Sequence, residues 1–210
     1  MKKFVEIGGF IAGGILIVFG VVVIAMGMSG RHTVDTSLKQ QQIVGTPDMT
    51  PAAIKAEAQK AGLKGNIPYP TCSAANVAIT NGSRARCFAQ YMQIHTLEAS
   101  GGLYYSQIPR YATADGKGTN DATKALKSNG QPVDSQARNL WVTETALTTA
   151  LNVSYMADQL SLFSIVIGIA LFLSGVGFAI LDFAALHRRR AATEPARAAV
   201  TPQTAKPVVA

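Results

Sequence analysis

Two long runs without a charged residue dominate the hydropathy pattern of the chain. The first covers residues 7–30 and the second covers residues 159–181. About 20 apolar residues in a helix cross the roughly 30 Å hydrocarbon core of a bilayer, so the pattern predicts two transmembrane helices. For the first run a cleaved signal peptide is the alternative. Its apolar length exceeds the roughly 7–15 residues of a signal peptide and favours an uncleaved signal-anchor.

Positive charges flank the two runs at one end each. They are Lys2, Lys3, Arg188, Arg189 and Arg190. Because Lys and Arg in short flanks stay on the cytoplasmic side, residues 1–6 and 182–210 are predicted to be cytoplasmic and residues 31–158 extracytoplasmic. The three arginines are then a cytoplasmic anchor, and the predicted location is the plasma membrane.

The net charge of +7 does not indicate a nucleic-acid partner. Five of the positive residues belong to the membrane flanks, where they meet anionic lipid head groups. The partners that the sequence predicts are membrane lipids and an envelope protein or further copies of the chain. No nucleic acid is expected.

The only two cysteines, Cys72 and Cys87, both fall in the predicted extracytoplasmic segment. Disulfides persist in such an oxidising compartment, and the spacing fits no zinc motif, so a disulfide is predicted. Two free thiols are the alternative. Closing this short loop stabilises a small domain by roughly 3 kcal/mol.

Helix signals punctuate the segment between the two runs. Thr50 before Pro51 predicts a helix over residues 51–61, and the Asn81-Gly82-Ser83 turn predicts a second helix that ends near Gly101. Phe88, Tyr91, Met92 and His95 give that second helix an apolar stripe at helical spacing.

Three further helical segments are expected. A short helix is expected over residues 120–127, and a long helix is expected from Asp134 into the second run. The first run is expected to continue outward toward Gly45, whereas the Ala-, Pro- and Thr-rich tail within residues 182–210 is expected to be disordered. The predicted fold is therefore an all-α membrane protein. It has two antiparallel transmembrane helices extended outward and a small, disulfide-clamped helical domain between them.

Small residues recur at intervals of seven in both runs, at Gly13, Gly20, Gly27, Ser161, Gly168 and Gly175. Laid antiparallel, Gly27 meets Ser161, Gly20 meets Gly168 and Gly13 meets Gly175. Small residues let helices approach closely in lipid, so these are predicted helix-packing positions. The alternative is that the glycines contact a helix of another protein.

The same spacing reaches Glu6 in the first helix and Asp182 after the second. Two carboxylates in a poorly hydrated site tend to share one proton, which makes Glu6 and Asp182 a candidate carboxylate pair. The alternative is that each acid forms a snorkelling ion pair with the neighbouring Lys or Arg residues.

Catalytic and cofactor patterns are missing from the sequence. The three histidines, His32, His95 and His187, follow no metal-binding motif, and no nucleophile elbow or phosphate-binding glycine loop occurs. His95 is interpreted as a partly buried histidine on the apolar face of its helix. The sequence thus predicts a protein that is not an enzyme, with no metal and no cofactor.

Aromatic residues and arginine gather in the predicted outer domain, at Tyr104, Tyr105, Arg110, Tyr111 and Trp141. Such residues supply most of the binding energy in many interfaces, so this group is a candidate recognition surface. Structural packing is the alternative.

Three further stretches carry a recognisable pattern, residues 44–58 (VGTPDMTPAAIKAEA), 141–147 (WVTETAL) and 154–157 (SYMA). Together they resemble an uncharacterised family of two-span membrane proteins of actinobacteria. Some members of that family are labelled aromatic ring-opening dioxygenases. The chain lacks the two-histidine, one-carboxylate iron triad that such a reaction would use, so the resemblance transfers no catalytic residue.

The function expected from these features is that of a non-catalytic accessory or scaffold protein. Its extracytoplasmic domain would mediate protein–protein interaction in the cell envelope. One alternative is an envelope ligand-binding or sensor protein, which requires a concave apolar pocket. Another is a small oligomeric channel or proton-linked subunit that uses Glu6 and Asp182.

Overall fold

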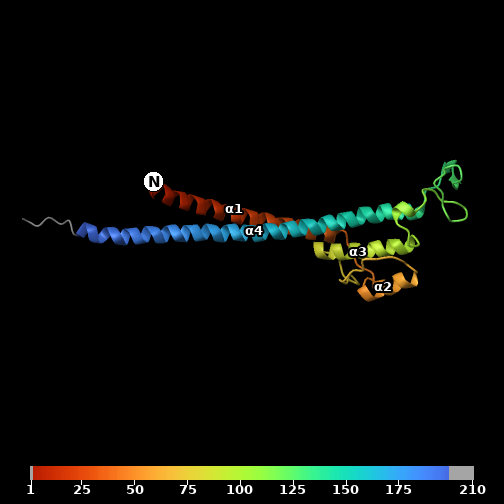
Figure 1. Ribbon diagram of the computed structural model, residues 1–210, viewed down its shortest axis with the longest axis horizontal. Helices are drawn as coiled ribbons and strands as arrows, with labels where there is room; N and C mark the ends of the chain where they lie inside the picture. The colour runs from red at the N-terminus through yellow and green to blue at the C-terminus, as the bar shows by residue number, and fades with distance from the viewer. Residues whose placement is uncertain (1, 199–210) are drawn as a thin grey trace, which may run out of the picture. The chain divides into compact units, whose positions relative to one another are not determined.

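The computed structural model describes the backbone of residues 2–198 and the side chains of residues 8–188. The described chain is mostly helical (Figure 1). Its elements are α1 (Lys2–Gln40), α2 (Pro51–Lys60), α3 (Gly82–Ala99), the 3-10 turn η1 (Tyr105–Gln107), β1 (Lys127–Ser128), β2 (Gln131–Pro132) and α4 (Gln136–Ala198).

The chain divides into two compact units. The first, here called the helix-pair unit, contains residues 1–27 and 163–210. The second, called the disulfide unit, contains residues 28–162.

Two helical segments are long and apolar enough to cross a membrane, Gly8–Gln40 and Gln136–Arg188. In the helix-pair unit the large apolar side chains are mostly exposed, and Val18, Phe19 and Leu173 each keep about 60% of their surface. A helix that is apolar all round needs a protein core or lipid around it. In this unit the protein supplies little such cover.

Helix starts follow the predicted capping signals. The Thr50 side chain accepts a hydrogen bond from Ala53 N at 3.2 Å, and Pro51 occupies the first turn of α2. The Asn81 side chain accepts from Arg84 N at 3.0 Å at the start of α3. These bonds satisfy backbone N–H groups that have no partner within the helix.

Three helix predictions need correction. The first helix ends at Gln40, before the expected Gly45, and α4 begins at Gln136, two residues after Asp134. The expected disorder from residue 182 is wrong as far as Ala198, because α4 continues to that residue. Alanine and arginine, which fill much of this stretch, have high helix propensity. Residues 199–210 lie outside the described part of the chain.

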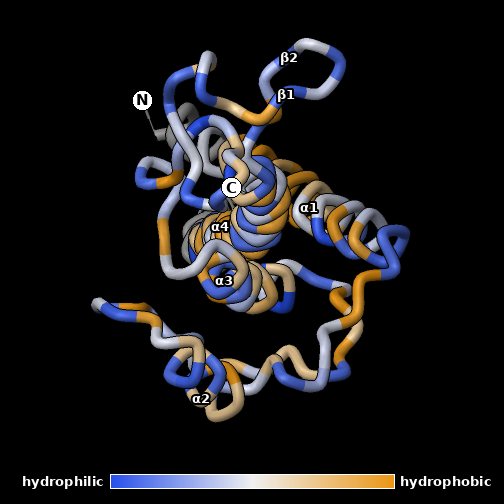
Figure 2. The backbone as a smooth tube through the Cα atoms, turned by 90° about the vertical axis from the view of Figure 1, so that its right-hand side faces the viewer, coloured by the Kyte–Doolittle hydropathy of each residue, from blue (hydrophilic) through white to orange (hydrophobic). Residues whose placement is uncertain are grey.

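The short helix expected over residues 120–127 is wrong, because residues 120–126 form turns and bends and a β-hairpin begins at Lys127. Lys127 pairs with Pro132 in an antiparallel register. The turn residues Asn129 and Gly130 have φ values of 52° and 77°, as a type I′ turn requires. Figure 2 shows this hairpin mostly in the blue and white of polar residues, so it adds little to the core.

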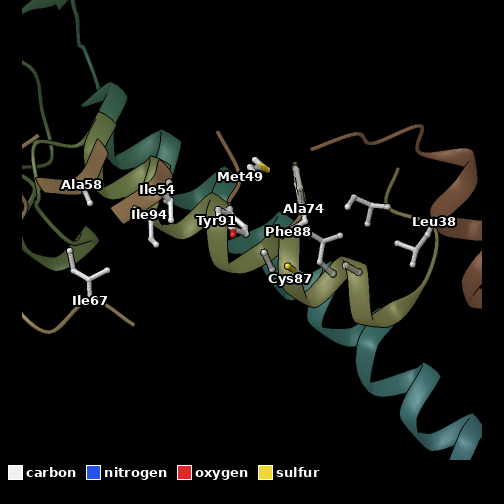
Figure 3. Packing of buried hydrophobic residues seen from close by; sticks show 14 residues of the cluster. Leu38, Met49, Ile54, Ala58, Ile67, Ala74, Cys87, Phe88, Tyr91 and Ile94 are labelled. Carbon is white, nitrogen blue, oxygen red and sulfur yellow. The ribbon is translucent and has the colours of Figure 1, made fainter. Parts of the chain in front are cut away.

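The main core of the disulfide unit lies among α2, α3 and the segments that lead into them, together with Leu38 of α1 and Leu151 of α4. Ile54 of α2 and Tyr91 and Ile94 of α3 are fully buried there. Figure 3 shows how these side chains lie in the cluster.

The predicted disulfide joins Cys72 to Cys87. Beside it the Tyr91 hydroxyl donates a 2.6 Å hydrogen bond to Cys72 O. Covalent and polar links therefore hold residues 67–72, here called the Pro-rich segment, on α3.

Candidate functional site

Four glycines of the helix-pair unit leave no room for a side chain, namely Gly13, Gly20, Gly168 and Gly175. A methyl group built on Gly20 would lie 2.7 Å from Gly168 O, and one on Gly13 would lie 3.0 Å from Gly175 O. The reverse contacts are equally short, at 2.8 Å and 2.7 Å. These are two of the three pairs that the spacing of seven predicts, and small residues at such positions let two helix backbones pack closely.

The third predicted pair differs. In the disulfide unit it is Gly30 whose added methyl group would meet the Ser161 hydroxyl. Gly27, the predicted partner, is buried but belongs to the helix-pair unit. Gly27 and Gly30 are three residues apart and share one helix face, and a heptad stripe drifts about 20° per repeat on a straight helix. The spacing of seven therefore predicts the helix face that contacts Ser161, but not which glycine on that face makes the contact.

Asp182 packs against α1. A methyl group on Gly9 would overlap the Asp182 carboxylate, and Oδ2 is a buried atom without a hydrogen-bond partner in the described structure. The Glu6 side chain lies outside the described residues, as do those of Arg189 and Arg190, while Arg188 is exposed. The carboxylate pair thus stays a prediction.

The predicted aromatic surface divides into a buried and an exposed part. Trp141 is only 5% exposed, its indole N–H donates to Leu103 O at 3.0 Å, and its ring lies 5.7 Å from that of Tyr104. Trp141 is therefore a packing residue that fixes the segment after α3. Tyr105 is exposed, and the Arg138 guanidinium lies 4.2 Å from its ring centre.

Arg110 and Tyr111 form a separate stacked pair. Their guanidinium and ring centre are 5.6 Å apart. The cation that contacts the Tyr105 ring is Arg138. The sequence analysis did not include Arg138 in the candidate recognition surface.

An exposed stripe runs along α4 within the disulfide unit. Successive members are alternately four and three residues apart, and all of them are exposed. They are Val142, Ala146, Thr149, Val153, Met156 and Leu160. Val142 keeps 56% of its surface and Met156 keeps 64%. The opposite face of the helix carries the buried Leu151. We call this set the α4 stripe.

A hollow of about 520 Å³ opens at the end of the α4 stripe near η1. Its wall is mainly apolar and is formed by Tyr105, Trp141, Val142, Thr145, Ala146 and Thr149. Half of these residues belong to the stripe, so the hollow and the stripe form one surface.

A buried carboxylate lies on another face of α4. Glu144 is 5% exposed and lines a hollow of about 450 Å³ together with polar side chains of α3, among them Arg86 and Gln90. Burial raises the pKa of Glu144, and hydrogen bonds from Thr148 and Thr145 oppose the rise. The ionised carboxylate is thus poorly solvated in the folded protein.

Replacing Glu144 with glutamine should stabilise the fold at neutral pH. Because the pKa of Glu144 is raised in the folded protein, the contribution of Glu144 to the free energy of unfolding is fully present below its ordinary pKa of 4.5. That contribution is lost as the pH rises through the folded-state pKa. The melting temperature of the variant should therefore exceed that of the wild type at pH 7, with the gap narrowing at pH 4. A gap that is equal at both pH values would contradict this reasoning.

A second cluster surrounds His95. Its Nε2 lies 3.2 Å from Asp48 Oδ2, and its Nδ1 lies 3.8 Å from Glu98 Oε2. A carboxylate oxygen of Glu57 lies within 4.8 Å of the ligand atoms of Asp48 and His95. The His95 side chain is 28% exposed, as its place on the apolar face of α3 predicted.

The sequence interpretation missed most of this cluster. Only the three-residue step from His95 to Glu98 is visible as a local pattern. Asp48 precedes α2 and Glu57 lies within it, so only the packing of α2 on α3 brings them to the histidine. His32, by contrast, is exposed on α1.

No family model, curated protein or solved structure matches this chain. The resemblance to two-span actinobacterial membrane proteins stays a prediction.

Proposed function

We propose that this chain is an integral membrane scaffold or accessory protein that binds a helix of another envelope protein through the α4 stripe. In this proposal two antiparallel transmembrane helices keep both termini in the cytoplasm. They hold the disulfide unit outside the membrane.

The membrane part of the proposal is supported by the two long apolar helices and by the close glycine contacts between them. Side chains that would form a core in water are exposed on these helices, as lipid-facing residues are. The flanking lysines and arginines give the orientation through the positive-inside rule. The disulfide agrees with an oxidising outer compartment.

The observation that carries the interaction is the exposure of the α4 stripe. Its spacing of alternately four and three residues is that of a coiled-coil seam. From Val142 to Leu160 the stripe runs about 27 Å at roughly 1.5 Å per residue. A partner helix of similar length covers such a seam, whereas a small ligand does not.

The hollow at the end of the stripe suits one large side chain of that partner. Tyr105 and Val142 contribute exposed apolar surface to it, and the Arg138 guanidinium stacked on Tyr105 gives it a charged rim. Interfaces commonly bind one anchor residue in such a place, within a wider area of weaker contacts. A separate role in binding an envelope ligand would use the hollow, with its stripe members Val142, Ala146 and Thr149, but not the rest of the stripe.

The test compares two neighbouring, β-branched and exposed positions of α4. Val142→Lys places a charge in the stripe, and Thr143→Lys places the same charge about 100° around the helix. With a C-terminal tag, native membranes are cross-linked briefly and extracted in mild detergent, and the co-purifying proteins are identified by mass spectrometry. We expect a stoichiometric partner that is lost with Val142→Lys and kept with Thr143→Lys.

A second, differently tagged copy of the chain is expressed alongside the first. If Val142→Lys abolishes capture of this second copy, the partner helix is α4 of another copy of the chain. Capture that is equal for both variants would contradict a role for the stripe. Loss of a small bound molecule in place of a protein would favour the ligand-binding alternative.

A further inference from the structure

Three segments of the disulfide unit bring ligand-type side chains to one point. Asp48 lies just before α2, Glu57 lies in α2 and His95 lies in α3. One ligand atom from each lies within 4.8 Å of the other two. The donor set combines an imidazole nitrogen with carboxylate oxygens, which is a set that binds zinc and related divalent transition metals in proteins.

The contact between His95 and Asp48 has the separation of two ligands on one ion. His95 Nε2 is 3.2 Å from Asp48 Oδ2, yet this buried nitrogen has no hydrogen-bond partner in the described structure. Two atoms that each lie about 2.0–2.2 Å from a tetrahedral zinc ion are about 3.4 Å apart. The two atoms are therefore within ion-pair distance, but their geometry is not that of a hydrogen bond.

Glu98 stands on the other side of the imidazole ring. Its Oε2 lies 3.8 Å from His95 Nδ1, and its other oxygen is buried without a hydrogen-bond partner in the described part of the chain. Metal-binding histidines usually direct their second ring nitrogen at a carboxylate, which fixes the ring and makes the free nitrogen more basic. Glu98 has the position of such a positioning residue.

Negative charge accumulates around the histidine. Carboxylate oxygens of Asp48 and Glu98 lie 3.2 Å and 3.8 Å from the two imidazole nitrogens, and a Glu57 oxygen lies within 4.8 Å of the ligand atoms of Asp48 and His95. Among the described residues, His95 is the only basic group within ion-pair distance of Asp48 or Glu98. A divalent cation would neutralise this excess where a single imidazole does not.

We propose that Asp48, Glu57 and His95 bind one divalent transition-metal ion of the zinc class, with Glu98 orienting the imidazole. The ion joins the segment before α2 to both α2 and α3. Three protein ligands leave a fourth position of a tetrahedral ion for water or another ligand. The partial exposure of His95 and Asp48 gives the ion a route from solvent.

Zinc binding to the full-length chain in detergent micelles tests the proposal. The protein carries a tag without histidine, is treated with a chelator and is titrated with Zn²⁺ by calorimetry. We expect one site per chain and a higher melting temperature with zinc. His95→Gln and Glu57→Gln should each weaken binding by at least about tenfold, and Glu98→Gln by about 10-fold to 100-fold, the range for positioning residues.

His32→Gln is the matched control because it removes an exposed histidine outside the cluster. It should bind zinc as the wild type does. If His95→Gln folds poorly, Glu57→Gln with an unchanged circular dichroism spectrum keeps the test valid. Absence of saturable zinc binding by the wild type would overturn the proposal, and so would equal affinity in the Glu57→Gln variant.

The choice of metal class is tested by competition. Ca²⁺ and Mg²⁺ prefer oxygen ligands, whereas imidazole favours zinc. A large excess of either ion should leave zinc binding intact. Displacement of zinc by Ca²⁺ at equal concentration would contradict the role given to His95.

Discussion

Cys87→Ser should lower the free energy of unfolding of the disulfide unit by about 3 kcal/mol, the value expected for a closed loop of roughly 15 residues. The bond between Cys72 and Cys87 spans a sequence separation of 15 and holds the Pro-rich segment against the core. The loss arises mainly because the unfolded chain regains the freedom that the closed loop removes.

Trp141 allows this loss to be measured in the full chain. It is the only tryptophan and is buried in the disulfide unit, so urea unfolding in detergent micelles can be followed by its fluorescence. Cys72→Ser and the double variant should behave as Cys87→Ser does, and a reductant should destabilise only the wild type. A loss below about 1 kcal/mol would show that the disulfide is not a main source of stability.

Gly20→Val should destabilise the helix-pair unit by about 1–3 kcal/mol, the usual cost of overpacking a close contact. The added Cβ would lie 2.7 Å from two backbone atoms, Gly168 O and Phe172 N, which cannot turn away as a side chain can. When the detergent-solubilised protein is heated, the temperature at which half of it has precipitated should be lower for Gly20→Val than for the wild type.

Gly14→Val is the matched control for this substitution. Gly14 lies in the same helix, is exposed and has open space around an added methyl group. It shares the change in helix propensity but not the clash. Equal precipitation temperatures for the two variants would contradict close packing at Gly20.

Local signals in the sequence were sufficient for much of the fold. Thr50 and Asn81 predict helix starts through hydrogen bonds to backbone groups three residues away, and the cysteine pair predicts its own bond. The Asn129-Gly130 pair also carries a local signal for a hairpin, which the prediction of a short helix overlooked. Such features depend on neighbouring residues alone.

Features that depend on distant residues were not predictable in the same way. Asp48 and His95 are brought together by the packing of α2 on α3, and no spacing rule joins them. In α4 the sequence contains two apolar faces, one through Trp141 and Leu151 and one through Val142 and Val153. Periodicity identifies both faces but does not say which of them the fold buries.

Photo-cross-linking from α4 in native membranes tests the central claim most directly. A photoreactive amino acid at Val153, in the α4 stripe, is compared with the same residue at exposed Asn152, about 100° around the helix. We expect a cross-link from position 153 to one defined helix of a partner or of a second copy, and little from position 152. Equal cross-linking from both positions, or none from position 153, would contradict it.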